Sequence, residues 1–233
     1  MGNVVPHAQA AAKPAVEAAP IRAENGMQLA SLLFFVSGIA ALTYQICWQR
    51  ALFGWYGVDL DSVSAIVSIF MLGLGTGALA GGWLADRYPD HRILVFSGIE
   101  LLIAVFGFAS LDLIDAAGVL FSGQSLPVIV GLTFVVFLLP TVAMGATLPV
   151  LVTELTHRTG NVGASTGHLY YINTLGAAAG AFACAYVLLP IGGLDGAVQT
   201  AAAGNLAVSL IAALAYRRAR RQPSTYAVPG EAA

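Results

Sequence analysis

Charge is what this sequence lacks most. Of its 233 residues only 9% are charged, whereas 58% are hydrophobic and the mean hydropathy is +0.80. Soluble domains carry roughly 25% charged residues, so the composition excludes a water-soluble globule. The net charge of −2 gives no electrostatic reason to expect a nucleic-acid partner. The partner that the composition predicts is the lipid bilayer.

Cysteines and catalytic motifs are scarce too. The two cysteines, Cys47 and Cys184, lie inside apolar runs, which favours small buried side chains over a disulfide or a metal pair. The chain has no Ser-His-Asp spacing, Walker loop, CxxC or HExxH. The GLGTG string at 73–77 lies within an uncharged apolar run, where a nucleotide loop does not form. The sequence therefore predicts no catalytic residue, no metal site and no cofactor.

Long apolar runs are what the chain has instead. About 20 apolar residues cross the bilayer as a helix, because every backbone group must find its hydrogen bond within the segment. Six runs qualify, so we expect an all-α integral membrane protein with six transmembrane helices: approximately Met27–Trp48, Val63–Ala85, Ile93–Leu111, Leu126–Thr153, Ala164–Leu189 and Leu194–Tyr216. Pro140 and Pro149 predict a tilt or kink in the fourth helix.

Two polar tails flank this domain of residues 27–216. The first 26 residues are rich in Ala, Pro and polar residues and have no apolar core, so they do not resemble a cleavable signal peptide. We expect residues 1–26 to be a disordered cytoplasmic tail. Residues 217–233 begin with four arginines and predict a basic, flexible second tail.

The basic residues fix an orientation for six helices. If the chain crosses the membrane six times, nine of the ten Lys and Arg residues fall on one side of the membrane, and Arg50 alone falls on the other side. The nine are Lys13, Arg22, Arg87, Arg92, Arg158, Arg217, Arg218, Arg220 and Arg221. Because cytoplasmic loops carry the excess of positive charge, both termini are expected in the cytoplasm.

Small residues recur at helical spacing in two of the runs. The second run contains Gly73, Gly77 and Gly81, and the fifth contains Gly176 and Gly180. Helix association in lipid depends on close backbone approach at such residues. These glycines predict tight helix pairing, either within the chain or between copies.

Glu100 is the acid that lies well inside an apolar run. A carboxylate at that depth costs several kcal/mol unless it is paired or protonated, and such residues are often functional. One interpretation is a proton or cation site, or a partner for Arg50 or a polyamine. The other is a structural carboxyl group that forms hydrogen bonds to a neighbouring helix.

Other polar groups gather at helix ends. Tyr44 and Gln45 belong to YQICWQR, which is typical of an interfacial aromatic anchor, or of a polar pocket open to the outside. His168, Tyr171 and Asn173 open the fifth run in GHLYYINTLG. They are candidates for interhelical hydrogen bonds or for ligand binding.

Four blocks in order carry a family resemblance. They are YQICWQR, GGWLADR, PTVAMGATLPVL (Pro140–Leu151) and GHLYYINTLGAAAGA…LLPIGG (Gly167–Gly193). Together they resemble the membrane portion of bacterial spermidine-synthase-like membrane proteins, often labelled fused spermidine synthase/transporter-like proteins. The resemblance implies a bacterial inner-membrane protein. Fused members continue into an aminopropyltransferase domain, and with 17 residues after Tyr216 we expect this chain to lack it.

That membrane portion is in turn similar to half of a major-facilitator transporter. The resemblance implies a 3+3 inverted repeat and a G-x-L-A-D-R loop between the second and third helices. Gly82, Asp86 and Arg87 match this loop, which closes at Arg92. Pro89 and Asp90 depart from it, since the superfamily has glycine and a basic residue there.

Three functions are compatible with these features. The first is a transport-like or scaffold subunit of a membrane assembly, paired with a second copy or with another membrane protein. The second is a small polyamine or cation transporter that works as a homodimer with Glu100 as its intramembrane acid. The third is a membrane anchor for a separately encoded, soluble aminopropyl- or methyltransferase.

Overall fold

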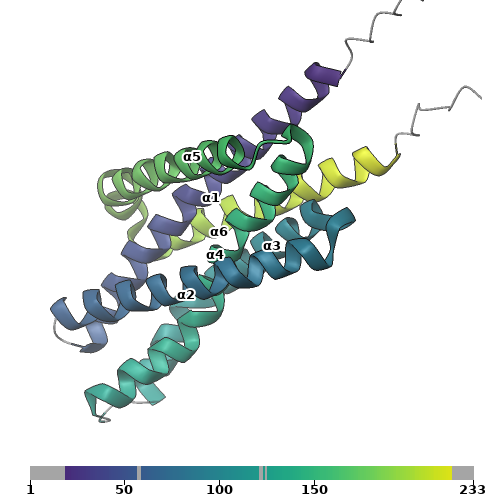
Figure 1. Ribbon diagram of the computed structural model, residues 1–233. Coiled ribbons are helices and arrows are strands. Elements are labelled where there is room, and N and C mark those ends of the chain that lie inside the picture. The colour runs from purple at the N-terminus through teal and green to yellow at the C-terminus, as the bar shows by residue number, and fades with distance from the viewer. Residues whose placement is uncertain (1–18, 57–58, 121–122, 124, 222–233) are drawn as a thin grey trace, which may run out of the picture.

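The described part of the protein is a bundle of long helices (Figure 1). The computed structural model describes residues 19–56, 59–120, 123 and 125–221, and within them there is no strand. The elements are α1 (Ala19–Tyr56), α2 (Asp59–Arg87), the 3₁₀ turn η1 (Pro89–His91), α3 (Arg92–Leu120), α4 (Leu126–Thr159), α5 (Val162–Ala183), the π-helical turn η2 (Cys184–Leu188) and α6 (Leu189–Arg221).

Five helical stretches of the described residues are long and apolar enough to cross a membrane. The fifth of them, Val162–Arg221, joins α5, η2 and α6 without a loop. Its direction changes at Gly193, whose φ of 63° and ψ of −162° lie outside the helical region. Glycine adopts this left-handed backbone without steric strain. The prediction of a membrane-embedded helical protein agrees with this architecture, and the count of six separate spans stays a prediction.

Several helices extend beyond the expected apolar runs. Helix α1 begins at Ala19, within the segment expected as a tail, and continues past Trp48 to Tyr56. Helix α3 continues past Leu111, where the expected apolar run ends, to Leu120. Helix α4 runs through both of its prolines. The remainder of the two expected tails, residues 1–18 and 222–233, lies outside the described residues.

The most extensive helix contacts join the first three helices to the last three. Helix α2 packs on α4, α1 on α5 and α3 on α6, with smaller contacts of α1 with α6 and of α3 with α4. The set of pairs is symmetric between the two halves. If α1 is exchanged with α4, α2 with α5 and α3 with α6, the same helix pairs result. Each half of the chain therefore packs mainly on the other half.

The glycine ridges form the two equivalent contacts, α2 on α4 and α5 on α1. A Cβ atom added to Gly77 would collide with Val142 O, and one added to Gly176 would collide with Phe35 O. In the same way Gly81 abuts Ala146, and Gly180 abuts Ile39. Backbones approach this closely only where side chains are absent, which explains the spacing seen in the sequence.

The two contacts also share one register. The ridge glycines of α2 meet Val142 and Ala146 of α4, and those of α5 meet Phe35 and Ile39 of α1. Val142 lies 107 positions after Phe35, and Ala146 lies 107 positions after Ile39. On the partner helices, Gly176 and Gly180 both lie 99 positions after Gly77 and Gly81. The glycines of α1 and α4 that face back across the same contacts, Gly38 and Gly145, are again 107 positions apart. The first half of the chain thus repeats in the second.

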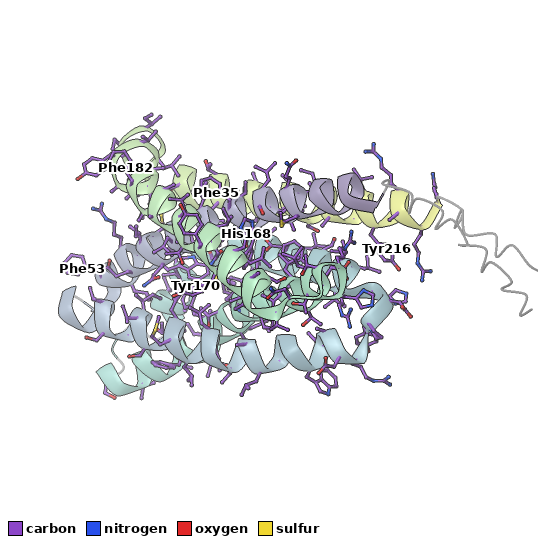
Figure 2. The ribbon with its side chains drawn as sticks, turned by 45° about the horizontal axis from the view of Figure 1, so that its top comes forward. Phe35, Phe53, His168, Tyr170, Phe182 and Tyr216 are labelled. Atoms are coloured by element: carbon purple, nitrogen blue, oxygen red, sulfur yellow. The ribbon has the colours of Figure 1, made fainter. Side chains whose placement is uncertain are left out.

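The two ends of the bundle differ. We call one the basic end, because it holds the start of α1, the α2–α3 and α4–α5 turns and the arginines at the end of α6. Tyr216 lies at this end and Phe53 and Phe182 at the opposite end (Figure 2). The opposite end is filled by rings around Trp48, whose centroid lies 4.7 Å from that of Phe137 and 4.9 Å from that of Tyr44.

Trp48 and Tyr44 are fully buried within this aromatic cluster. The indole nitrogen of Trp48 donates a hydrogen bond to Ser110 Oγ at 2.9 Å. The interpretation of YQICWQR as an interfacial anchor is therefore wrong for these two side chains. Ser110 supplies the partner that the indole N–H of Trp48 requires when the ring is buried.

The two cysteines meet in the core of the fold. Cys47 Sγ on α1 lies 3.7 Å from Cys184 Sγ at the start of η2, and both are fully buried, free thiols. We expect copper-phenanthroline oxidation in membranes to convert them into an intramolecular disulfide, because a small movement brings the sulfurs to bonding distance. Mass spectrometry after denaturation and maleimide labelling should show two modified thiols before oxidation and none after it. Cys47→Ser is the control, and unchanged labelling or cross-linked dimers would contradict the contact.

Candidate functional site

The candidate site is a polar cluster in the apolar interior, at the contact of α1, α3 and α6. Glu100 of α3 is fully buried. Its Oε1 accepts a hydrogen bond from Ser37 Oγ of α1 at 2.7 Å, and its Oε2 accepts one from Asn205 Nδ2 of α6 at 2.6 Å. The carboxyl group therefore bonds to the helices on both sides of its own.

These bonds do not involve a basic side chain. The ion pair that the structure shows among the described residues is Glu154 with Arg158, at the basic end of α4. The proposed pairing of Glu100 with Arg50 is therefore not what the structure shows, since both carboxyl oxygens are held by neutral donors. A buried carboxyl group without a cation favours either a bound proton or a bound cation over an isolated charge.

A small cavity of about 90 Å³ borders the cluster. Ser37 and Asn205 line it together with Gln45, Asn173 and Thr147. The Oδ1 atom of Asn205 is buried and has no hydrogen-bond partner in the structure. The rest of the lining is apolar, so these polar groups converge on one part of a mainly apolar cavity whose volume accommodates a few water molecules or a small cation. Glu100 is thus connected to the cavity through the two residues that hold it.

The sequence-predicted candidates divide between this cavity and other places. Gln45 and Asn173 line the cavity, and Glu100 lies behind it. The ring of Tyr44 instead faces α3, where its hydroxyl group is buried against Gly107 without a hydrogen-bond partner. Tyr171 is 62% exposed on the outer surface of α5.

His168 lies on α5 as well (Figure 2) and is not among the residues that line the cavity. Its Nε2 is 2.7 Å from Ser31 Oγ, and that hydroxyl group donates to Met27 O at 2.8 Å. Since the serine proton is already used, Nε2–H of His168 is the donor in the contact. This arrangement is an interhelical hydrogen bond between α5 and α1.

The residues of the loop motif occupy the turn between α2 and α3. Arg92 Nε donates to Ala85 O at 3.1 Å, which ties the start of α3 to the last turns of α2. The guanidinium of Arg87 lies 5.8 Å from the ring centroid of Tyr88, and Asp86 is exposed. No side chain lies near Gly82. The motif therefore closes a helical hairpin and does not contact the polar cluster.

Two central members of the cluster, Ser37 and Asn205, escaped the sequence reasoning. Asn205 lies in the middle of an apolar helix within AAAGNLAVSL, and an amide at such a depth is itself a signal. Ser37 gives no comparable signal, because serine is ordinary in membrane helices. Only the packing of α1 on α3 shows that its hydroxyl group reaches Glu100.

Comparison with known proteins places the chain near transporters. A stretch of 80 residues is 32% identical to a triacylglyceride transporter of Mycolicibacterium hassiacum, and a stretch of 81 residues is 36% identical to one of Mycolicibacterium smegmatis. The matches cover 34% and 30% of this chain and 14% of each relative. No protein-family model and no solved structure matches the chain. The apolar helices and these relatives together support a membrane transport-like role.

Proposed function

We propose that this protein is a transport-like membrane module in which Glu100 is the intramembrane acid. The observation that carries the proposal is the placement of Glu100 between Ser37 and Asn205, both of which line a small cavity inside a mainly apolar bundle. Ionisable groups inside membrane helices mark ion and proton pathways. A proton reaching the cavity would pass to the carboxylate through the Ser37 hydroxyl group, which lines the cavity and gives its own proton to Glu100 Oε1 as it accepts one from the cavity.

The repeat of the chain supports the rest of the proposed architecture. Inverted-topology repeats place a substrate or ion site at the junction of the two halves, near the middle of the membrane. The contact pattern and the shared register of the two glycine contacts are those expected of a 3+3 repeat. We propose six spans in a bacterial inner membrane. Both termini then lie in the cytoplasm, as the distribution of positive charge predicts.

The repeat also suggests a partner. The matched stretch covers 14% of each transporter relative, and the sequence blocks resemble half of a major-facilitator transporter, in which two such halves form the transport unit. We propose that a second copy, or another membrane protein, completes the transport unit. The link to spermidine-synthase-like proteins rests on the four sequence blocks and makes polyamines the first cargo to examine. The relatives make acylglycerols the second.

Reconstitution of the full chain in proteoliposomes tests this function. We expect uptake of radiolabelled spermidine or transfer of a fluorescent acylglycerol that depends on an imposed pH gradient, and we expect Glu100→Gln to abolish that dependence. Asp112→Asn is the matched control, because it removes an exposed acid from the same helix, outside the lining of both cavities, and should leave uptake unchanged. Gradient-dependent transport that survives Glu100→Gln would remove Glu100 from the mechanism.

The same protein, purified from native membranes in nanodiscs, tests the partner. A transport unit of two modules predicts a mass of two copies, or of one copy with another membrane protein. Absence of transport together with co-purification of a soluble transferase would instead show that the chain is an anchor. A strictly monomeric protein without activity would contradict both the partner and the transport role.

A further inference from the structure

A second cavity, larger than the first, opens at the basic end. Its volume is about 470 Å³, and it lies between the ends of α1, α3, α4 and α6. Leu33, Phe96 and Leu155 contribute to an apolar floor that is almost completely buried. Arg92, Arg158 and Arg220 stand at its rim. This volume lies in the range of small-molecule sites, and the polar cluster at Glu100 does not line it.

The repeat shows why this end is hollow. The offset of 107 positions pairs Tyr44 and Trp48 of α1 with Leu151 and Leu155 of α4. The same offset pairs Phe137 of α4 with Ala30 of α1. At the opposite end the three aromatic rings pack on one another and fill the bundle. At the basic end their counterparts, two leucines and an alanine, line the cavity.

Equivalent helices thus enclose a filled space at one end and an open one at the other. The helix packing by itself does not require the cavity, because the same packing accommodates Trp48 and its neighbours at the opposite end. Close-packed interiors leave few large voids, and an apolar cavity of this size exposes its lining without compensation unless a ligand covers it. The side chains at the basic end are therefore suited to an apolar occupant.

The rim of the cavity determines the polar end of that occupant. Glu154 is already used, since Nε and Nη2 of Arg158 both donate to its Oε1, at 2.8 and 2.6 Å. Asp90 is then the remaining acid at the rim, beside Arg92 and Arg220. Among the described residues Arg220 forms no ion pair with a carboxylate, and it lies over the ring of Tyr216, at 5.6 Å from its centroid. The rim thus carries a net positive charge, and guanidinium groups suit carboxylate and phosphate.

We propose that this cavity binds a single-chain amphiphile, whose anionic head group lies at the arginine rim and whose acyl chain occupies the apolar floor. The head group is a carboxylate or a phosphate ester, as in a fatty acid or a lysophospholipid. The site is open at the end of the bundle where such molecules enter from the membrane surface. It does not depend on Glu100, so the proposal stands apart from the transport mechanism above.

Photolabelling of the full chain in nanodiscs tests the site. A palmitic acid probe with a diazirine on its chain should label the peptide around Leu151 and Leu155 in wild-type protein. Ala30→Phe and Leu155→Trp, which transplant the rings of the opposite end, should remove this labelling. Labelling of the lipid-facing side of α2 serves as the internal standard and should not change. Ala78→Phe, at an exposed position of α2, is the control for an added ring.

Two arginine variants test whether the cavity requires an anionic head group. Arg220→Gln should weaken palmitate labelling in the cavity about tenfold, as expected for loss of a charge-assisted hydrogen bond. Arg218→Gln, two residues away and outside the cavity lining, should have no effect. Competition by excess unlabelled palmitate or lysophosphatidic acid shows which source of the anion is preferred.

Three outcomes would overturn the proposal. One is equal labelling of the cavity by a diazirine alkyl trimethylammonium of the same chain length. Another is labelling that persists in both ring-transplant variants while their thermal unfolding matches that of the wild type. The third is cavity labelling no greater than that of the lipid-facing surface of α2. If one transplant variant does not fold, the other and Arg220→Gln still decide.

Discussion

Gly77→Leu is expected to prevent stable packing of α2 on α4. A Cβ at residue 77 already collides with Val142 O and lies 2.9 Å from Gly145 Cα, so both clashes are with backbone that has no rotamer to adopt. Overpacking of a well-filled contact costs about 1–3 kcal/mol, and a clash with backbone places this variant at or beyond the upper limit. Thermal unfolding in nanodiscs should show a large fall in Tm or loss of the folded protein.

The same helix provides the control for that result. Gly75 is two residues away and has no atom within 4 Å of an added Cβ, so Gly75→Leu should keep the wild-type Tm or raise it through better helix propensity. The second glycine contact offers an independent pair. Gly176→Leu should behave like the first variant and Gly167→Leu like its control. Equal effects at residues 75 and 77 would contradict the close contact of α2 with α4.

Glu100→Leu should produce the second large loss of stability. Removal of the carboxyl group leaves the Ser37 hydroxyl and the Asn205 amide buried without an acceptor. Each buried group left unpaired costs about 1–3 kcal/mol. We therefore expect a lower Tm by thermal unfolding in nanodiscs.

Glu100→Gln should be far less damaging. Asn205 Oδ1 has no partner in the wild type, so a flipped Asn205 amide accepts a hydrogen bond from the new glutamine nitrogen, while Ser37 still donates to the glutamine oxygen. The glutamine variant therefore separates loss of the ionisable group from loss of packing. Glu154→Gln, which breaks an exposed pair, should change stability by about 0–1 kcal/mol. Equal Tm values for Glu100→Leu and the wild type would show that the cluster does not support the fold.

Hydropathy predicted the helical membrane architecture because the bilayer itself imposes length and apolarity on its spanning segments. Helix ends were predicted less well, since α1 and α3 continue past the apolar core to Tyr56 and Leu120, where hydropathy no longer guides the boundary. The break at Gly193 was placed near the correct residue, but the absence of a loop around it was not foreseen.

The candidate site was only half visible from the sequence. Glu100 is conspicuous because an acid in an apolar run is expensive, whereas its partners belong to residue types that membrane helices tolerate well. Which helix faces α3 depends on tertiary packing. That packing depends on close contacts of glycines, and the sequence around a glycine does not indicate which helix it contacts. Trp48 shows the same limit, since the same residue suits a membrane interface and a buried cluster.

The packing of each half on the other has a consequence for biosynthesis. Ribosomes deliver α1, α2 and α3 to the membrane before α4 exists, and the partners of Gly73, Gly77 and Gly81 all belong to α4. Because α1, α2 and α3 make few contacts among themselves, these helices remain separate in the lipid until α4 is inserted. Compaction of these helices therefore begins only after residues 141–146 of α4 have entered the membrane. A nascent chain interrupted before that point has no native bundle to form and remains a substrate for membrane quality control.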